Sequence, residues 1–255
     1  MITITHDKIL GFTPVWAPFN GFSFLFDNPD NGVSPLQQNS ELMKFDSVLS
    51  HPALELYQAC VDALNTLNTH LLTNTYLFCP LPPSSYHVTV WDGLNVRNLT
   101  DVPSSEQQMW GDFVRNLPDT FHENSEFIHW ASASSLTQNL DWNITFRLDT
   151  FYQWGTGMGI LLKPADQESE RLLKEIENRR EDLYNNFPVK IAHPQYTPHV
   201  TLGYFANRES AQLTTPLIAD WTKIFEEAVG DLTITYHSIS LYGFTDMITF
   251  FKTKQ

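Results

Sequence analysis

The chain has 255 residues, of which 42% are hydrophobic, 13% aromatic and 17% charged. This composition predicts a folded globular protein and excludes an intrinsically disordered one. Twenty-nine acidic against 15 basic side chains give a formal charge of −14, and a surface of that sign repels phosphate backbones. We therefore expect no extended contact with DNA or long RNA, although a few local donors can still hold a small anionic ligand.

The apolar runs of the sequence are too short to span a bilayer, and the first residues, MITITHDKILGF, lack a basic segment followed by an apolar one. The sequence therefore predicts a cytoplasmic protein with no membrane partner. The two cysteines, Cys60 and Cys79, are too few for a disulfide framework, and we expect both to be buried thiols. The sequence leaves the oligomeric state open.

The first 140 residues predict strands and helices separated by two insertions. Apolar residues recur at helical spacing between positions 50 and 70. The segment before this helix is rich in turn residues and predicts a long loop. In chain order, the predicted elements are a strand at Asn20–Phe26, the loop at Asp27–Ser40, the helix at 50–70, strands at Thr75–Cys79 and Tyr86–Trp91, a helix at Ser104–Leu117 and an insertion at Leu117–Leu140.

The rest of the chain repeats the order of strand, helix and strand. Its predicted elements are strands at Trp142–Phe151 and Gly157–Lys163, a helix from about Asp166, a strand at His199–Tyr204, a helix at Glu209–Val229, and closing strands at Leu232–Tyr242 and Met247–Thr253. Because each part ends this order with a strand that carries His-Val-Thr, we expect one domain of two similar halves, at about 1–140 and 141–255. The closing strands either join two sheets or extend one of them.

The repeated pattern reads HVTV at residues 87–90 and HVTL at residues 199–202. Side chains alternate between the faces of a strand, so His87 and Thr89 share one face, as do His199 and Thr201. The branched residues between them point to the opposite face, toward a predicted layer of helices. If the two strands meet at a cleft, two imidazoles and two hydroxyls converge there.

This set of side chains suits the cleavage of a phosphodiester. One neutral histidine can take a proton from the attacking oxygen, and the other, as imidazolium, can donate a proton to the leaving oxygen. The threonine hydroxyls can donate to the non-bridging oxygens, where negative charge grows. The sequence therefore predicts His87, Thr89, His199 and Thr201 as catalytic residues that need no metal and no cofactor. It does not distinguish the acid from the base.

Two aromatic residues near the motifs are candidates for stacking on a base. Trp91 is expected on the face of His87 and Thr89, and Tyr196 lies three positions before His199. The alternative is that both rings pack in the core.

Other polar residues give weaker signals. Arg147, Lys163 and Arg208 could supply positive charge to a phosphate, but a solvated surface position is the better explanation for each of them. His193 and His199 are separated by five residues, and together with His87 or His237 they could suggest a zinc site, but cysteine ligands and a metal-ligand motif are absent from the sequence.

The two motifs resemble those of the two-histidine phosphoesterases, which include 2',3'-cyclic nucleotide phosphodiesterases and 2'-5' RNA ligase-like proteins. The segment YTPHVTLG at 196–203 is especially similar to the second motif of that family. The resemblance implies a bilobal α+β fold, with two pseudo-symmetric antiparallel sheets lining a central groove, helices outside and no metal. It also implies that His87 and His199 are the acid–base pair and that Thr89 and Thr201 hold the phosphate.

The acidic charge and the two insertions depart from members that act on tRNA-like substrates. They favour a small cyclic nucleotide, or a short 2'-5' or 3'-5' linked one, as the substrate. Two alternatives stay open: a nucleotide-binding protein on the same fold that does not turn over its ligand, and an RNA end-processing or 2'-5' ligase-like enzyme. Retention of all four motif side chains favours an enzyme.

Overall fold

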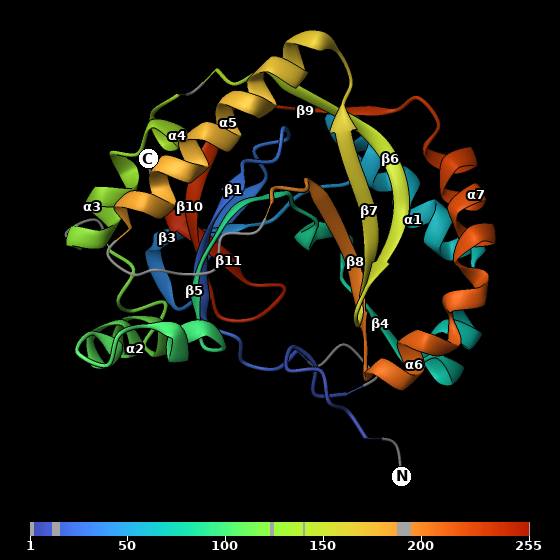
Figure 1. The fold of residues 1–255 in the computed structure, drawn as a ribbon, viewed down its shortest axis with the longest axis horizontal. Helices are drawn as coiled ribbons and strands as arrows, with labels where there is room; N and C mark the ends of the chain where they lie inside the picture. The colour runs from blue at the N-terminus through green and yellow to red at the C-terminus, as the bar shows by residue number, and fades with distance from the viewer. Residues whose placement is uncertain (1–2, 12–15, 123–124, 140, 188–194, 255) are drawn as a thin grey trace.

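The computed structural model describes residues 3–11, 16–122, 125–139, 141–187 and 195–254. They form an α+β fold with two antiparallel sheets and with helices on the outer side of each sheet (Figure 1). The six-stranded sheet has the order β2-β3-β11-β10-β1-β5, and the five-stranded sheet has the order β4-β8-β7-β6-β9. The prediction of two antiparallel sheets in an α+β fold is thus confirmed.

The strands of the six-stranded sheet are β1 (Gly21–Phe26), β2 (Val33–Leu36), β3 (Asn39–Phe45), β5 (Thr89–Asn95), β10 (Ile239–Phe244) and β11 (Phe250–Thr253). Those of the five-stranded sheet are β4 (Phe78–Pro80), β6 (Ile144–Trp154), β7 (Gly157–Pro164), β8 (His199–Phe205) and β9 (Thr233–Tyr236). The α-helices are α1 (Glu55–Thr66), α2 (Gln107–Arg115), α3 (Glu126–Ser132), α4 (Ser135–Gln138), α5 (Gln167–Asn186), α6 (Arg208–Leu213) and α7 (Ile218–Val229).

Several predicted elements differ from the observed ones. The polar segment predicted as a loop at 27–40 contains β2 and the start of β3, which form a hairpin. The predicted helix at 209–229 is two helices, because Pro216 lies in a 3-10 turn between α6 and α7. The predicted strand at 232–242 is also divided, and its two parts, β9 and β10, belong to different sheets. The closing strands therefore both extend the five-stranded sheet and complete the six-stranded one.

The two halves of the sequence do not correspond to the two sheets. β4 comes from the first half but pairs with β8 in the five-stranded sheet, and β10 and β11 come from the second half but pair in the six-stranded sheet. Helix α1 of the first half packs on α7 over the five-stranded sheet, and α5 of the second half starts beside β6 and β7 and reaches the six-stranded sheet near its C-terminal end, where Tyr184 packs on Trp91 of β5 (Figure 1). The division of the chain at about residue 140 therefore does not describe the observed lobes.

The side chains of β1 point alternately into the core and into the cleft. Phe22, Phe24 and Phe26 are buried on the face that is covered by helices. Ser23 and Leu25, between them, point to the opposite face and line the cleft between the two sheets. One strand therefore anchors the helix layer and forms part of the wall of the candidate site.

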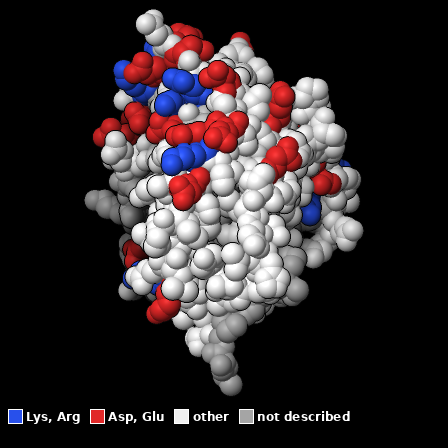
Figure 2. Space-filling model, turned by 90° about the vertical axis from the view of Figure 1, so that its right-hand side faces the viewer, with Lys and Arg blue, Asp and Glu red and all other residues white. Residues whose placement is uncertain are grey.

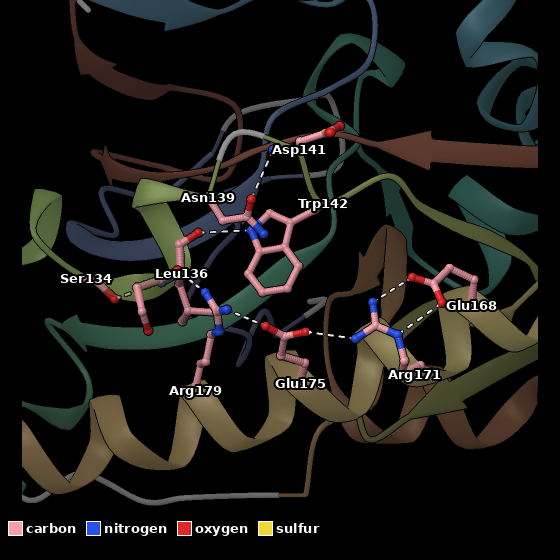
Figure 3. Close-up of polar contacts among 10 residues, drawn as sticks. Ser134, Leu136, Asn139, Asp141, Trp142, Glu168, Arg171, Glu175 and Arg179 are labelled. Carbon is pink, nitrogen blue, oxygen red and sulfur yellow. Dashed lines mark hydrogen bonds and ion pairs between the residues drawn. The ribbon is translucent and has the colours of Figure 1, made fainter.

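Helix α5 is capped at its N-terminus and held by ion pairs and a cation–π contact along its length. Asp166 caps its first turn, with Oδ1 accepting from the N–H of Ser169 at 2.7 Å, as the predicted helix start near this residue requires. Its exposed face carries a chain of ion pairs through Glu168, Arg171, Glu175 and Arg179 (Figure 3). The guanidinium of Arg179 lies 4.8 Å from the ring of Trp142, which ties the helix to the segment before β6.

Charged side chains are unevenly distributed over the face of the molecule that Figure 2 shows. On the face that Figure 2 shows, acidic side chains lie beside basic ones near the top, and most of the remaining surface is uncharged. Of the helices that the structure describes, none combines the length and apolar character needed to cross a membrane. Cys60 and Cys79 are buried free thiols, as predicted.

Candidate active site

The two motif strands meet at the bottom of the cleft. Val88 and Val200 form an antiparallel bridge, and both side chains are fully buried beneath the cleft. In an antiparallel register, the residue before Val88 lies opposite the residue after Val200, and the residue after Val88 lies opposite the residue before Val200. His87 therefore lies opposite Thr201, and Thr89 lies opposite His199.

All four predicted catalytic side chains line one cleft with a volume of about 370 Å³. This volume is within the range that small-molecule sites usually have. Other lining residues come from the N-terminal segment, from β1, from β5 and the turn after it, from the ends of β6 and β8, and from β10, β11 and the segment between them. The structure thus brings His87, Thr89, His199 and Thr201 together.

The two histidines are held by the same local hydrogen bond. Nδ1 of His87 lies 2.7 Å from the carbonyl oxygen of Ser85, and Nδ1 of His199 lies 2.8 Å from that of Thr197. Because a carbonyl only accepts, Nδ1 must carry the proton in both rings. Each neutral imidazole therefore keeps its free electron pair on Nε2, and both Nε2 atoms are available to a ligand.

The surroundings of the two rings differ. His87 packs against Phe250, with ring centroids 4.5 Å apart, and its edge meets Phe45. Burial, together with the charges of His199 and Lys8, lowers the pKa of His87 to about 4, although its bond to Ser85 opposes that shift. The imidazole of His87 is therefore neutral at physiological pH and is able to accept a proton.

An extra residue follows the threonine in each motif strand. On β5, Thr89 pairs with Leu25 and Trp91 pairs with Phe24, so Val90 is additional. On β8, Thr201 pairs with Gly159 and Gly203 pairs with Met158, so Leu202 is additional. Each extra residue reverses the faces of the residues after it. Asp92 and Tyr204, each five positions after a motif histidine, consequently both point into the cleft.

This irregularity explains why the prediction for Trp91 is wrong. Trp91 does not share the face of His87 and Thr89, because the extra residue turns it to the side of Phe24. Its side chain is 0% exposed and packs against Phe24, Tyr184 and Phe187. The indole belongs to the core and cannot stack on a ligand in the cleft.

Tyr196 is also not placed for stacking. The guanidinium of Arg180 lies 4.2 Å from the centroid of its ring, and its hydroxyl is buried. Tyr196 is not among the described residues that line the cleft. Its expected role as a stacking residue is therefore wrong as well, and packing under Arg180 is what the structure shows.

The aromatic surface beside the histidines is instead provided by Trp154 and Tyr152 on β6. The Trp154 ring lies edge-on to His199, with centroids 5.1 Å apart and planes at 70°. Tyr152 is nearly parallel to Trp154, at 16°, and is 46% exposed. A second depression of about 320 Å³, lined by both rings together with Leu161, Thr197 and His199, opens next to the first.

Two glycines of β7 make room for this indole. A Cβ at Gly157 would lie 2.6 Å from Nε1 of Trp154, and a Cβ at Gly159 would lie 2.9 Å from the far edge of the ring. The indole therefore rests on the bare backbone of β7, and the alternate glycines in WGTGMG were the signal for it in the sequence. Nothing local in the sequence links these glycines to His199, so the sequence alone does not predict the position of the indole.

The cations near the cleft also differ from the candidates in the sequence. Lys163 pairs with Asp149, and Arg147 and Arg208 are exposed away from the cleft. The basic residues that line it are Lys8 and Arg97. Among the described residues, no three His, Cys, Asp or Glu side chains gather into a group that could hold a metal. His193, one of the histidines considered for zinc, lies outside the described residues.

Comparisons with known proteins identify the fold but not the function. No protein-family model matches the chain, and no curated protein matches it. A solved structure of a conserved protein of unknown function from Agrobacterium tumefaciens is similar, with a TM-score of 0.52 and 15% sequence identity. The similarity covers 97% of this chain and 89% of that one, so the two proteins share an arrangement of elements along almost their whole length.

Proposed function

We propose that this protein is a phosphodiesterase of the two-histidine type that hydrolyses a small cyclic or short linked nucleotide. The observation that carries the proposal is the four-residue set formed across the Val88–Val200 bridge, in which each histidine lies opposite the threonine of the other motif. Two imidazoles with matched Nδ1 contacts are what acid–base cleavage of a phosphodiester requires.

The proposed reaction uses His87 as the base and His199 as the acid. Nε2 of His87 takes a proton from water while the water oxygen forms a bond to phosphorus. The bond between phosphorus and the leaving ribose oxygen breaks, and that oxygen takes a proton from the imidazolium of His199. The assignment of the base follows from the lowered pKa of His87, because a ring that stays neutral is ready to accept a proton.

The two threonines have the electrostatic role. Thr89 and Thr201 line the cleft, each opposite the histidine of the other motif, so their hydroxyls can donate to the two non-bridging oxygens. These oxygens gain negative charge in the transition state, and donors fixed in advance stabilise that charge most effectively.

A small nucleotide fits the remaining features of the cleft. Trp154 offers a flat ring next to His199, on which a base can stack while its phosphate lies between the histidines. Asp92 and Asp101 line the cleft as well, and their charges oppose a long polyanionic chain. These carboxylates favour a short substrate over RNA end processing or ligation.

The test is turnover of 2',3'-cyclic, 3',5'-cyclic and 2'-5' linked nucleotides in the presence of EDTA. We expect cleavage of one class by the wild-type protein and a loss of 10²–10⁴-fold in both His87→Asn and His199→Asn. His129→Asn is the matched control, because His129 is exposed on α3, away from the cleft. A rate that survives either motif substitution would overturn the mechanism, and binding without turnover across the panel would indicate a binding protein instead.

A further inference from the structure

The N-terminal segment forms an arm that packs across one end of the cleft. The N–H groups of Thr5 and His6 donate to the carbonyl oxygen of Ala206, just beyond β8, at 2.8 and 3.0 Å. The N–H of Ala17 donates to the carbonyl oxygen of Lys8 at 3.1 Å. Main-chain bonds therefore fix the arm just before Lys8 and at Lys8 itself.

Apolar contacts hold the same arm in place. Ile9 is 2% exposed and packs with Leu77, Cys79 and Ala206 in a small core of its own. His6 packs on the ring of Tyr204, with centroids 4.7 Å apart. The arm is thus a built part of the fold, and its position decides where the side chain of Lys8 lies.

The ammonium group of Lys8 is held over two aromatic rings inside the cleft. Nζ lies 4.9 Å from the ring centroid of Phe19 and 5.0 Å from that of Tyr204, and it donates to the hydroxyl of Tyr204 at 3.4 Å. All three residues line the cleft. Rings of this kind orient a cation without neutralising it.

The charge of Lys8 has no carboxylate partner among the described ion pairs. The other cation of the cleft, Arg97, is engaged by Asp7 through its guanidinium. Asp92 and Asp101 line the same cleft, but neither forms an ion pair with Lys8. In a protein with 29 acidic residues, a cation left unpaired within a cleft marks a place where an anion from outside can bind.

This place is separate from the reacting centre. Tyr204 lies three residues after Thr201 on the same face of β8. At about 3.3 Å per residue, Tyr204 is on the order of 8–10 Å along the strand from Thr201, and His87 lies opposite Thr201 across the Val88–Val200 bridge. A single nucleotide that carries a phosphate on each side of its ribose can span such a distance.

We propose that Lys8 forms an anion subsite for a second phosphate of the substrate, distinct from the phosphate that is cleaved. The inference rests on the proposed function and names the substrate class more narrowly: a cyclic nucleotide that carries an additional phosphate on the opposite side of its ribose. Lys8 binds that group with a charge-assisted hydrogen bond, and Tyr204 fixes the direction of the ammonium.

Binding of two non-reacting nucleotides tests the subsite without relying on turnover. Adenosine 3',5'-bisphosphate and adenosine 3'-monophosphate differ by one phosphate, and calorimetry in EDTA gives the Kd of each. We expect the bisphosphate to bind at least about tenfold more tightly to the wild-type protein. In Lys8→Gln this ratio falls to less than about twofold, whereas Lys8→Arg keeps most of it.

The control for Lys8→Gln is the same substitution at a lysine far from the cleft. Lys174→Gln removes an exposed lysine on α5 and keeps the wild-type ratio. Equal binding of the two nucleotides by the wild-type protein, failure of both to bind, or an unchanged ratio in a folded Lys8→Gln protein overturns the subsite. If the bisphosphate binds more tightly in the expected ratio but no cyclic nucleotide is turned over, the proposed catalysis is refuted and the subsite stands. If a cyclic nucleotide is turned over but the two nucleotides bind equally well, the subsite is refuted and the proposed catalysis stands.

Discussion

Thr89 of β5 lies opposite His199 of β8, although the two residues belong to different sheets. The Val88–Val200 bridge creates this relationship, and its symmetric counterpart joins His87 to Thr201. Each half of the proposed reaction therefore draws on both motifs, since the imidazole from one strand works beside the hydroxyl from the other. A change in either strand is expected to affect both proton transfers.

Replacing either threonine by valine tests this arrangement. Thr89→Val and Thr201→Val keep the branched shape that a strand favours but remove the donor to a phosphate oxygen. We expect each to lower kcat by about 10–10³-fold while KM changes less, because the hydroxyl matters most when charge develops. Steady-state kinetics on the cleaved nucleotide give both constants. Thr235→Val, on β9, is the control, and a larger effect on KM than on kcat would assign the threonines to binding alone.

The pH dependence of the rate tests the assignment of the base. The pKa of His87 is lowered to about 4 by burial and by the nearby charges of His199 and Lys8. We therefore expect kcat/KM to rise with pH around 4 and to be independent of this group by pH 6. The measurement is a profile of kcat/KM from pH 3.5 to 8, with the folded fraction recorded at each point. An acidic limb centred near 6.5 would contradict the assignment.

Stability should depend on the same histidine. Its pKa is about 4 in the folded state against 6.5 in a model peptide, so between these values the unfolded chain binds more protons than the folded one. The free energy of unfolding therefore rises with pH from about 4 to 6.5 and is level above that for this group. In His87→Leu, the difference in urea stability between pH 5 and pH 7 should be smaller than in wild type. His129→Leu should keep the wild-type difference, and an unchanged difference in His87→Leu would show that His87 titrates alike in both states.

Trp154 is expected to act in substrate binding. Trp154→Leu removes the flat ring beside His199, and base stacking is worth about 1–3 kcal/mol, so KM for a nucleotide should rise about 5–150-fold. Ribose 2',3'-cyclic phosphate, which has no base, should show little change. Equal losses on both substrates would mean that the indole positions His199 rather than the base.

Trp91 gives the contrasting result. Its ring is completely buried among aromatic neighbours, so Trp91→Ala should lower the free energy of unfolding by about 3–5 kcal/mol. The folded fraction of that variant should keep the wild-type KM. Together the two tryptophans separate a structural ring from a binding one.

The sequence predicted the four site residues because their signal is local. The pattern of histidine, apolar residue and threonine occurs twice, and alternation within a short strand places both polar side chains on one face. Strands β1, β6 and β7 and helices α1 and α5 were predicted for the same reason, since their periodicity is strong.

The sequence could not reveal features that depend on strand pairing. An extra residue in a strand is defined by its partner, so the faces of Trp91 and Tyr204 could not be assigned without the register. Lys8 lies 196 residues from Tyr204, and no pattern near it indicates that the arm packs against β8. The hairpin of β2 and β3 was missed because its polar residues fit an edge of a sheet and a loop equally well.

The six-stranded sheet takes β10 and β11 from residues 141–255, and the five-stranded sheet takes β4 from residues 1–140. Neither residues 1–140 nor residues 141–255 contain a whole sheet, so cutting the chain between them leaves two fragments with unpaired strand edges. Such fragments would be expected to remain unstructured apart and to recover order only when mixed, each completing the hydrogen bonds of the other. We therefore expect the two lobes to unfold as a single cooperative unit, so that the alignment of the two histidines is lost when either lobe unfolds.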